Sequence, residues 1–308
     1  MSKDKYKVIN WKEYNEGLKK RGSLRLWIKA DIAEQWKYKG NKKRGGQQQY
    51  SDIAIELCLI IRKVYHLPLR QTQGFMISFF KQSRLSLKAP DYTTLSRRSS
   101  SLPVQLSVAK KGSIADIVVD SSGLKVYGEG EWKVRKHGAG KHRTWMKLHL
   151  AADETTQQIQ AVTLTTNAVD DATEVSALLK QIQTPVKSFK ADGGYDKHKV
   201  RKELYRNNIQ QVIPPQHNAV VSKKSLPYLQ ERDKAIQTIA DIGREEWKKQ
   251  EHYHQRSKAE TAMFRYKTII GNTLSARKIQ NQQTEVKIGC KILNITLQTN
   301  KPKSIKVA

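Results

Sequence analysis

The sequence predicts an α/β fold, in which a mixed β-sheet is flanked by helices and preceded by an all-helical region. Apolar residues recur at helical spacing up to about residue 98. From residue 113 onward, short apolar or alternating segments of strand length take turns with helical ones. The 308 residues suffice for one large domain or two modest ones. We therefore divide the chain into a helical region 1–110, an α/β domain 111–300 and a basic tail 301–308.

The net charge is the first indication of function. Lys and Arg total 57 and Asp and Glu total 28, so the chain carries +29 at pH 7. Such a charge repels itself in a folded chain, and a polyanion relieves that repulsion. Because the basic residues are spread along the whole chain, a disordered basic tail does not account for them. Nucleic acid is the expected partner, and a ribosome-associated protein is the plainer alternative.

Composition also bears on the cellular compartment. Cys58 and Cys290 lie far apart, each in an apolar run, so we expect small buried thiols in a reducing compartment. The N-terminal residues lack the apolar core of a signal peptide. No stretch approaches the roughly 18 to 20 apolar residues that cross a bilayer. We expect a cytoplasmic, nucleoid-associated protein that does not contact the membrane.

The first hundred residues contain several helix signals. Residues 11–36 are expected to form broken helix, and 39–49, KGNKKRGGQQQ, a flexible basic loop. Ser51 is placed to cap a largely apolar helix. Pro68 opens a second helix, and Pro90 stands at the start of a short third.

The third of these helices is rich in Thr and Arg. Three short helices that end in a basic one fit a helix-turn-helix, whose last helix lies in the major groove of DNA. Arg97 and Arg98 are then expected to contact DNA. A helical dimerisation bundle is the alternative.

The remainder of the chain alternates between strands and helices. The predicted order is three strands, a helix, a strand, a helix, a strand and then helices. Successive strands form an antiparallel meander, whereas helices between strands make parallel crossovers. This is the order of a ribonuclease-H-like fold. The strands are IADIVVDSS, TWMKLHLAAD, IQAVTLTTN, VKSFKADGGYD and QQVIPP.

Two aspartates are expected to end strands of this sheet. Asp120 follows an apolar run and precedes 121–123, SSG, and Asp192 precedes the flexible pair Gly193 and Gly194. Carboxylates that lie side by side at one sheet edge repel each other unless a cation sits between them. Hard oxygen ligands with open positions suit Mg²⁺ or Mn²⁺. Taken singly, each residue could instead be a turn or cap residue.

Other acids compete for this role. All five occur in cap or turn contexts, and Asp116 is the strongest rival because strand alternation puts it on the same face as Asp120. The rivals are Asp116, Asp153, Asp170, Asp171 and Asp196.

The segment YHQRSKAETAMFRYK is the most specific feature. On one continuous helix, at about 100° per residue, Tyr253, Arg256, Glu260 and Lys267 fall on a stripe about 60° wide. A solvated charged face is the usual meaning of such a stripe. A single acid among aromatic and cationic residues is better explained by a metal-binding Glu260 between phosphate-binding cations.

These residues also carry a family resemblance. The pattern Tyr-x2-Arg-x3-Glu-x6-Lys, with VVDSSGLKV around Asp120 and ADGGYDK around Asp192, is similar to bacterial insertion-sequence transposases of the DDE class, insertion-sequence family five. The resemblance covers roughly residues 50–297. It implies a ribonuclease-H-like catalytic domain and two divalent ions, Mg²⁺ or Mn²⁺, held by Asp120, Asp192 and Glu260. It also implies binding to the terminal inverted repeats of the element.

Several further residues are expected to contact DNA. Arg256 and Lys267 would hold phosphates of the scissile strand, and Tyr253 would pack on that strand or serve as a core residue. In the basic loop 128–142, Trp132 and Arg135 interleave an aromatic residue with cations, as nucleic-acid contact loops do. A plain solvated loop is the alternative there.

We therefore predict a DNA transposase that cleaves the 3′ ends of its element and transfers them into target double-stranded DNA. Pairing two DNA ends requires two protomers, so we expect a homodimer on DNA. The alternatives are a related ribonuclease-H-like nuclease, which would give no strand-transfer product, and a catalytically inert DNA-binding regulator built on the N-terminal helices.

Overall fold

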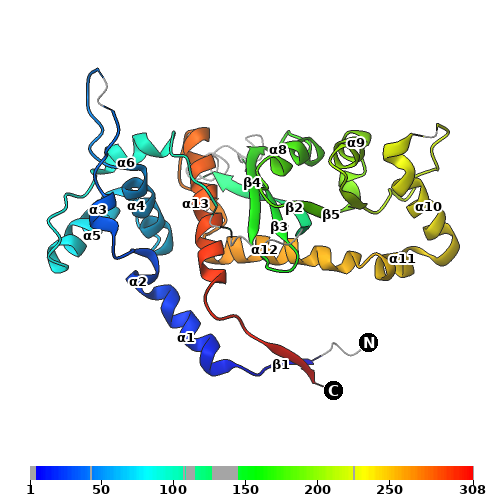
Figure 1. The fold of residues 1–308 in the computed structure, drawn as a ribbon, viewed down its shortest axis with the longest axis horizontal. Helices are drawn as coiled ribbons and strands as arrows, with labels where there is room; N and C mark the ends of the chain where they lie inside the picture. Colours follow the sequence, from blue (N-terminus) through cyan, green and yellow to red (C-terminus); the bar gives the residue numbers. More distant parts are fainter. Residues whose placement is uncertain are drawn as a thin grey trace, which may run out of the picture. The chain divides into compact units, whose positions relative to one another are not determined.

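The chain folds into two compact units (Figure 1). We call Met1–Gln105 together with Lys291–Ala308 the terminal unit, and Leu106–Cys290 the central unit. The computed structural model describes residues 5–41, 44–106, 108, 115–126, 145–224 and 226–307. Over those residues, no helix is both long and apolar enough to cross a membrane.

The terminal unit is mainly helical. The expected broken helix and the three helices after it are all present. They are α1 (Trp11–Gly22), α2 (Leu24–Trp27), α3 (Ile32–Gln35), α4 (Asp52–Val64), α5 (Leu69–Gln82) and α6 (Tyr92–Ser99). Residues from the two ends pair as an antiparallel ribbon of β1 (Lys5–Val8) and β8 (Ser304–Val307).

The helices of this unit begin where short polar side chains cap them. The Ser51 hydroxyl accepts a hydrogen bond from the Ala54 backbone N–H at 3.1 Å, as predicted. The cap of α6 is Asp91, because its carboxylate accepts from the backbone N–H groups of Thr93 and Thr94. Helices α4, α5 and α6 pack against one another. A helix-turn-helix and a dimerisation bundle share this packing, so the DNA-binding role of α6 stays a prediction.

The central unit contains the predicted mixed sheet, with strand order β4-β3-β2-β5-β6 and with β7 paired to β2. Strands β2, β3 and β4 are antiparallel, and β5 and β6 continue the sheet in parallel. The strands are β2 (Ala115–Val126), β3 (Trp145–Asp153), β4 (Ile159–Thr166), β5 (Val186–Lys190), β6 (Gln210–Val212) and β7 (Thr273–Leu274).

Helices cover both faces of the sheet, as Figure 1 shows for α8 and α9 against α12. On one face, Ile117 and Val119 belong to a buried cluster with residues of α8 (Val175–Leu179) and α9 (His198–Arg206). On the other face, Val118 packs with Ala259 and Ala262 of α12 (Ser257–Ile269). Because side chains alternate along a strand, Asp120 shares the α12 face with Val118.

Further short elements complete the central unit around this core. They are the 3-10 turns η1 (Asp171–Glu174), η2 (Gly193–Tyr195), η3 (Pro227–Leu229) and η4 (Tyr253–Arg256), and the helices α10 (Gln230–Ile242) and α11 (Arg244–Gln250). Helix α13 (Ile279–Leu297) follows β7.

Two details of the predicted elements are wrong. Asp120 does not end its strand, because β2 continues through 121–123, which pair with His149, Leu148 and Lys147 of β3. A long partner strand thus outweighs the low strand propensity of SSG. The helix that carries Glu260 does not begin at Tyr253 either: His252 adopts a left-handed backbone with φ of 49°, and η4 precedes α12.

Candidate active site

The sheet register brings Asp120 and Asp192 level with each other. Parallel strands β2 and β5 align Val118 with Lys190, the last residue of β5. Asp120 lies two residues after Val118, still within β2, and Asp192 lies two residues after Lys190, just beyond the end of β5. Because β5 has ended there while β2 continues, Asp120 lies beside the open end of the neighbouring strand.

Asp192 is held by the turn that follows it. Its Oδ1 accepts a hydrogen bond from the Gly194 N–H at 2.9 Å, and this contact caps η2. A Cβ atom at Gly194 would lie 3.0 Å from that oxygen, and one at Gly193 would lie 3.4 Å from the Pro214 carbonyl oxygen. The paired glycines therefore allow the turn to close tightly while the Asp192 side chain stays exposed.

Asp120 is the least exposed of the three predicted carboxylates, with 21% of its side chain accessible. Burial raises its pKa, and the negative charges of Asp192 and Glu260 act in the same direction. The Ser121 backbone N–H and the Arg256 guanidinium oppose this rise. The three acids thus share one electrostatic environment.

Arg256 lies between two of these acids. Its guanidinium forms an ion pair with Glu260, and Nη1 lies 3.9 Å from Asp120 Oδ1. Burial acts against the charged form of Arg256, but Tyr253, Glu260, Asp120 and Asp192 outweigh it and raise its pKa. Because residues three apart eclipse on a 3-10 turn, Tyr253 and Arg256 still face the same way despite the break before α12.

Among the described residues, the acids around Arg256 do not form a ready-made metal site. In the part of the chain that the structure describes, no three His, Cys, Asp or Glu side chains converge closely enough to hold an ion. Arg256 instead neutralises Asp120 and Glu260. The oxygen atoms around Arg256 that could bind a metal are carboxylate oxygens, which suit a hard divalent cation. Glu260 is 54% exposed and can change rotamer without disturbing the core.

The five rival acids all have structural partners. Their carboxylates accept hydrogen bonds that hold turns or link strands. The partners are Ser188 for Asp116, Thr156 for Asp153, Ala172 for Asp170, Lys147 for Asp171 and Arg201 for Asp196.

The Asp171 contacts lie directly behind Asp120, on the opposite face of β2. Asp171 accepts hydrogen bonds from the Ser121 hydroxyl and from Lys147 Nζ, both at 2.7 Å. Burial acts to raise the pKa of Asp171, but these two donors outweigh it and the pKa is lowered. His149 is fully buried beside this pair, and burial lowers its pKa. This network ties β2 and β3 to η1 next to the acids.

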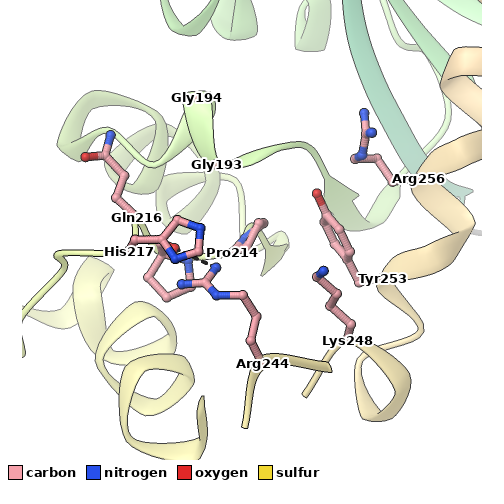
Figure 2. A pocket seen from close by; sticks show the side chains of 10 residues that line it. Gly193, Gly194, Pro214, Gln216, His217, Arg244, Lys248, Tyr253 and Arg256 are labelled. Carbon is pink, nitrogen blue, oxygen red and sulfur yellow. Dashed lines mark hydrogen bonds between the residues drawn. The ribbon is translucent and has the colours of Figure 1, made fainter. Parts of the chain in front are cut away.

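A cleft of about 590 Å³ opens beside the Asp192 turn. It is lined by Gly193–Gly194, by 214–217, and by Arg244, Lys248, Tyr253 and Arg256. Figure 2 shows Lys248, Tyr253 and Arg256 along one side, Gln216 and His217 on the other, and Arg244 reaching toward the 214–217 segment. We call this the α11 cleft.

Tyr253 packs against a buried residue and also lines the cleft. Its ring packs 6.0 Å from that of the buried Trp247, centroid to centroid. Burial raises the pKa of Tyr253, so its hydroxyl is neutral. The sequence alternatives for Tyr253, core packing and strand contact, are therefore compatible.

The other predicted DNA contacts are dispersed. Lys267 is half-buried in the last turn of α12, and Arg97 is exposed on α6. Arg98 donates to the Tyr50 carbonyl at 2.9 Å and pairs with Asp52, so it ties α6 to the start of α4. Trp132 and Arg135 lie outside the described residues. The sequence around Arg244 and Lys248 does not predict a cleft, because REEWKKQ has the composition of an ordinary surface helix.

A mixed sheet with neighbouring carboxylates beside a basic cleft is typical of enzymes that transfer phosphoryl groups in nucleic acids. Two family models, both described as "Transposase DDE domain", match residues 111–295 and 19–129. The first of these matches more than half of the chain. The chain belongs to this family and is a DDE transposase.

Solved transposase structures show only weak likeness. The piggyBac transposase synaptic complex with hairpin DNA is 11% identical with a TM-score of 0.38, over 89% of this chain and 74% of that one. The Drosophila P element transposase strand transfer complex is 10% identical with a TM-score of 0.32, over 82% and 81% of the two chains. These scores are too low to bear on the fold of this chain.

Proposed function

We propose that this transposase cleaves the 3′ ends of its own element and joins them to target DNA, with Asp120, Asp192 and Glu260 as the metal-binding residues. The observation that carries the proposal is the strand register that sets Asp120 level with Asp192, on the face covered by α12, which bears Glu260. The structural partners of the five rival acids support the same choice.

Transposases of this class generally use divalent metal ions such as Mg²⁺. We propose that Asp120, Asp192 and Glu260 would together hold two divalent ions, Mg²⁺ or Mn²⁺. When bound, such ions lower the pKa of an attacking water or 3′-hydroxyl and stabilise the leaving oxygen. To hold a metal ion, Glu260 would have to release Arg256, and the guanidinium would then be available to bind the scissile phosphate.

The remaining contacts with the DNA strand are made by cations and one aromatic ring. Arg256 and Lys267 hold phosphates of the scissile DNA strand. The Tyr253 ring packs on that DNA strand beside the α11 cleft. In the terminal unit, α6 with the exposed Arg97 contacts the terminal inverted repeats. The net charge of +29 supports DNA as the partner, because the basic residues can neutralise its phosphates.

Three finer assignments belong to the same proposal. The sheet order β4-β3-β2-β5-β6, with an antiparallel meander followed by parallel strands, supports a ribonuclease-H-like catalytic unit. The Tyr253, Arg256, Glu260 and Lys267 spacing supports insertion-sequence family five. Two DNA ends must be paired, so the active species is a homodimer on DNA.

A cleavage and joining assay tests this function. Purified protein is incubated with Mg²⁺, a target plasmid and labelled DNA that carries the sequences flanking this gene. Wild type is compared with Glu260→Gln, which removes one charge with little change of shape. Glu246→Gln is the matched control, because it removes an exposed carboxylate on α11 that forms a surface ion pair with Lys249.

The expected result is nicking at the element end and joining to the plasmid by wild type and Glu246→Gln, both lost in Glu260→Gln. Nicking without joining would indicate a nuclease. Cleavage that survives in Glu260→Gln would show that Glu260 is not the third carboxylate.

A further inference from the structure

The α11 cleft has a lining of one charge sign. Arg244, Lys248 and Arg256 contribute cations, and among the residues that the structure describes no Asp or Glu lines the cleft. The Arg244 guanidinium donates to the Pro215 carbonyl oxygen at 3.0 Å, which uses one of its five N–H donors. Arg244 is thus fixed at the wall of the cleft with donors to spare.

Lys248 is held only weakly. Its ammonium pairs with Glu245 at 2.9 Å, three residues earlier on α11, and that Glu245 side chain is 83% exposed. Exposed pairs of this kind contribute little to stability. Lys248 can therefore exchange Glu245 for a phosphate inside the cleft at small cost.

The volume of the cleft and the aromatic ring in its wall indicate which ligand it can hold. About 590 Å³ lies within the range of pockets that hold one small ligand, so a nucleotide or two fit inside the cleft. Tyr253 adds an aromatic face that Trp247 holds in place. Cations that follow a backbone, together with an aromatic ring on which a base stacks, are the elements of single-strand binding.

We propose that the α11 cleft binds an unpaired stretch of the DNA strand next to the scissile phosphate. Arg244 and Lys248 bind its phosphates, and Tyr253 stacks on a base. The inference rests on the proposed function, because the Gly193 and Gly194 turn that follows Asp192 forms one wall of the cleft. The preferred substrate is then an end whose strands have separated, rather than continuous duplex.

A binding assay without metal tests the inference. Fluorescence anisotropy compares a short blunt duplex with the same duplex extended by a short single-stranded oligothymidine, in buffer with EDTA. Lys248→Gln is set against Lys249→Gln, its neighbour on α11, which pairs with Glu246 and does not line the cleft. Tyr253→Leu is set against Tyr253→Phe, which keeps the ring.

Wild type is expected to bind the extended DNA more tightly, and Lys248→Gln to lose this preference. The slope of log affinity against log salt for the extension should fall by about 0.7 in Lys248→Gln and stay unchanged in Lys249→Gln. Tyr253→Leu should weaken binding of the extended DNA by about fivefold or more, whereas Tyr253→Phe should not.

Equal affinity of wild type for the two DNAs, or equal losses in Lys248→Gln and Lys249→Gln, would overturn the inference. No metal and no cleavage enter this assay. A failure of the cleft would therefore leave the cleavage and joining result standing, and a failure of cleavage would leave this result standing.

Discussion

Asp192 and Asp196 lie four residues apart in the chain, yet their replacement by Asn should affect different properties. Asp196→Asn should lower stability, whereas Asp192→Asn should lower the cleavage rate. The Asp196 side chain is only 1% exposed, and its Oδ1 accepts hydrogen bonds from Arg201 at 2.9 Å and from Arg232 at 3.1 Å. The Arg201 side chain is also 1% exposed. Asp196→Asn leaves that buried guanidinium without its counter-charge, which costs about 3–5 kcal/mol.

For a unit of this size, each kcal/mol lowers the melting temperature by about 2–4 °C, so Asp196→Asn should lower it by about 6–20 °C. Asp192→Asn should leave stability within about 0.5 kcal/mol of wild type, because an Asn oxygen can still accept from the Gly194 N–H. Its cleavage rate should fall at least about hundredfold, since a metal ligand contributes several kcal/mol to transition-state stabilisation.

Thermal unfolding followed by tryptophan fluorescence, together with the cleavage assay, measures both effects. Glu246→Gln serves as the control, because its exposed ion pair with Lys249 contributes at most about 1 kcal/mol. A melting temperature for Asp196→Asn close to that of the control would refute the buried network. A large fall for Asp192→Asn would refute the view that Asp192 serves chemistry rather than folding.

Three further predictions concern the metal, a buried histidine and a helix cap. At about 100 times its Kd, Mg²⁺ should stabilise wild type by about 2.7 kcal/mol and Glu260→Gln by clearly less; equal thermal shifts in the two proteins would count against the metal site. Burial lowers the pKa of His149 in the folded state below its ordinary 6.5, so the stability that neutral His149 contributes is present above pH 6.5 and is lost as pH falls below it. Urea midpoints on either side of pH 6.5 should diverge for wild type but less for His149→Gln, and an unchanged divergence would contradict this. Asp91→Ala should cost about 1 kcal/mol in urea unfolding and Asp91→Asn less, because only the former removes the acceptor for the Thr93 and Thr94 N–H groups; equal losses would exclude the cap.

The order of elements and the cap at Ser51 follow from local patterns, and these could be predicted from the sequence. The extent of β2 could not, because its pairing with β3 is a long-range contact that overrides the local SSG signal. The break before α12 could not be predicted either, because no residue around His252 indicates that it adopts a left-handed backbone.

Part of the candidate site could also be predicted from the sequence, and part could not. Asp120, Asp192 and Glu260 were distinguishable by motif, and their strand and helix positions suit a common site. The partners of the rival acids, such as Arg201 for Asp196, depend on segments that only the fold brings together. The place of Arg244 and Lys248 in a cleft could not be predicted from the sequence, because another wall of the α11 cleft comes from residues 214–217.

The ribbon of β1 and β8 makes the terminal unit discontinuous in sequence, and this affects the order in which a ribosome allows the protein to fold. Lys5–Val8 is synthesised before the central unit, but its partner Ser304–Val307 is synthesised after it. The central unit is contiguous and can fold while synthesis continues. The central sheet can therefore form before the terminal unit is complete, and β1 must wait for β8 before it can pair.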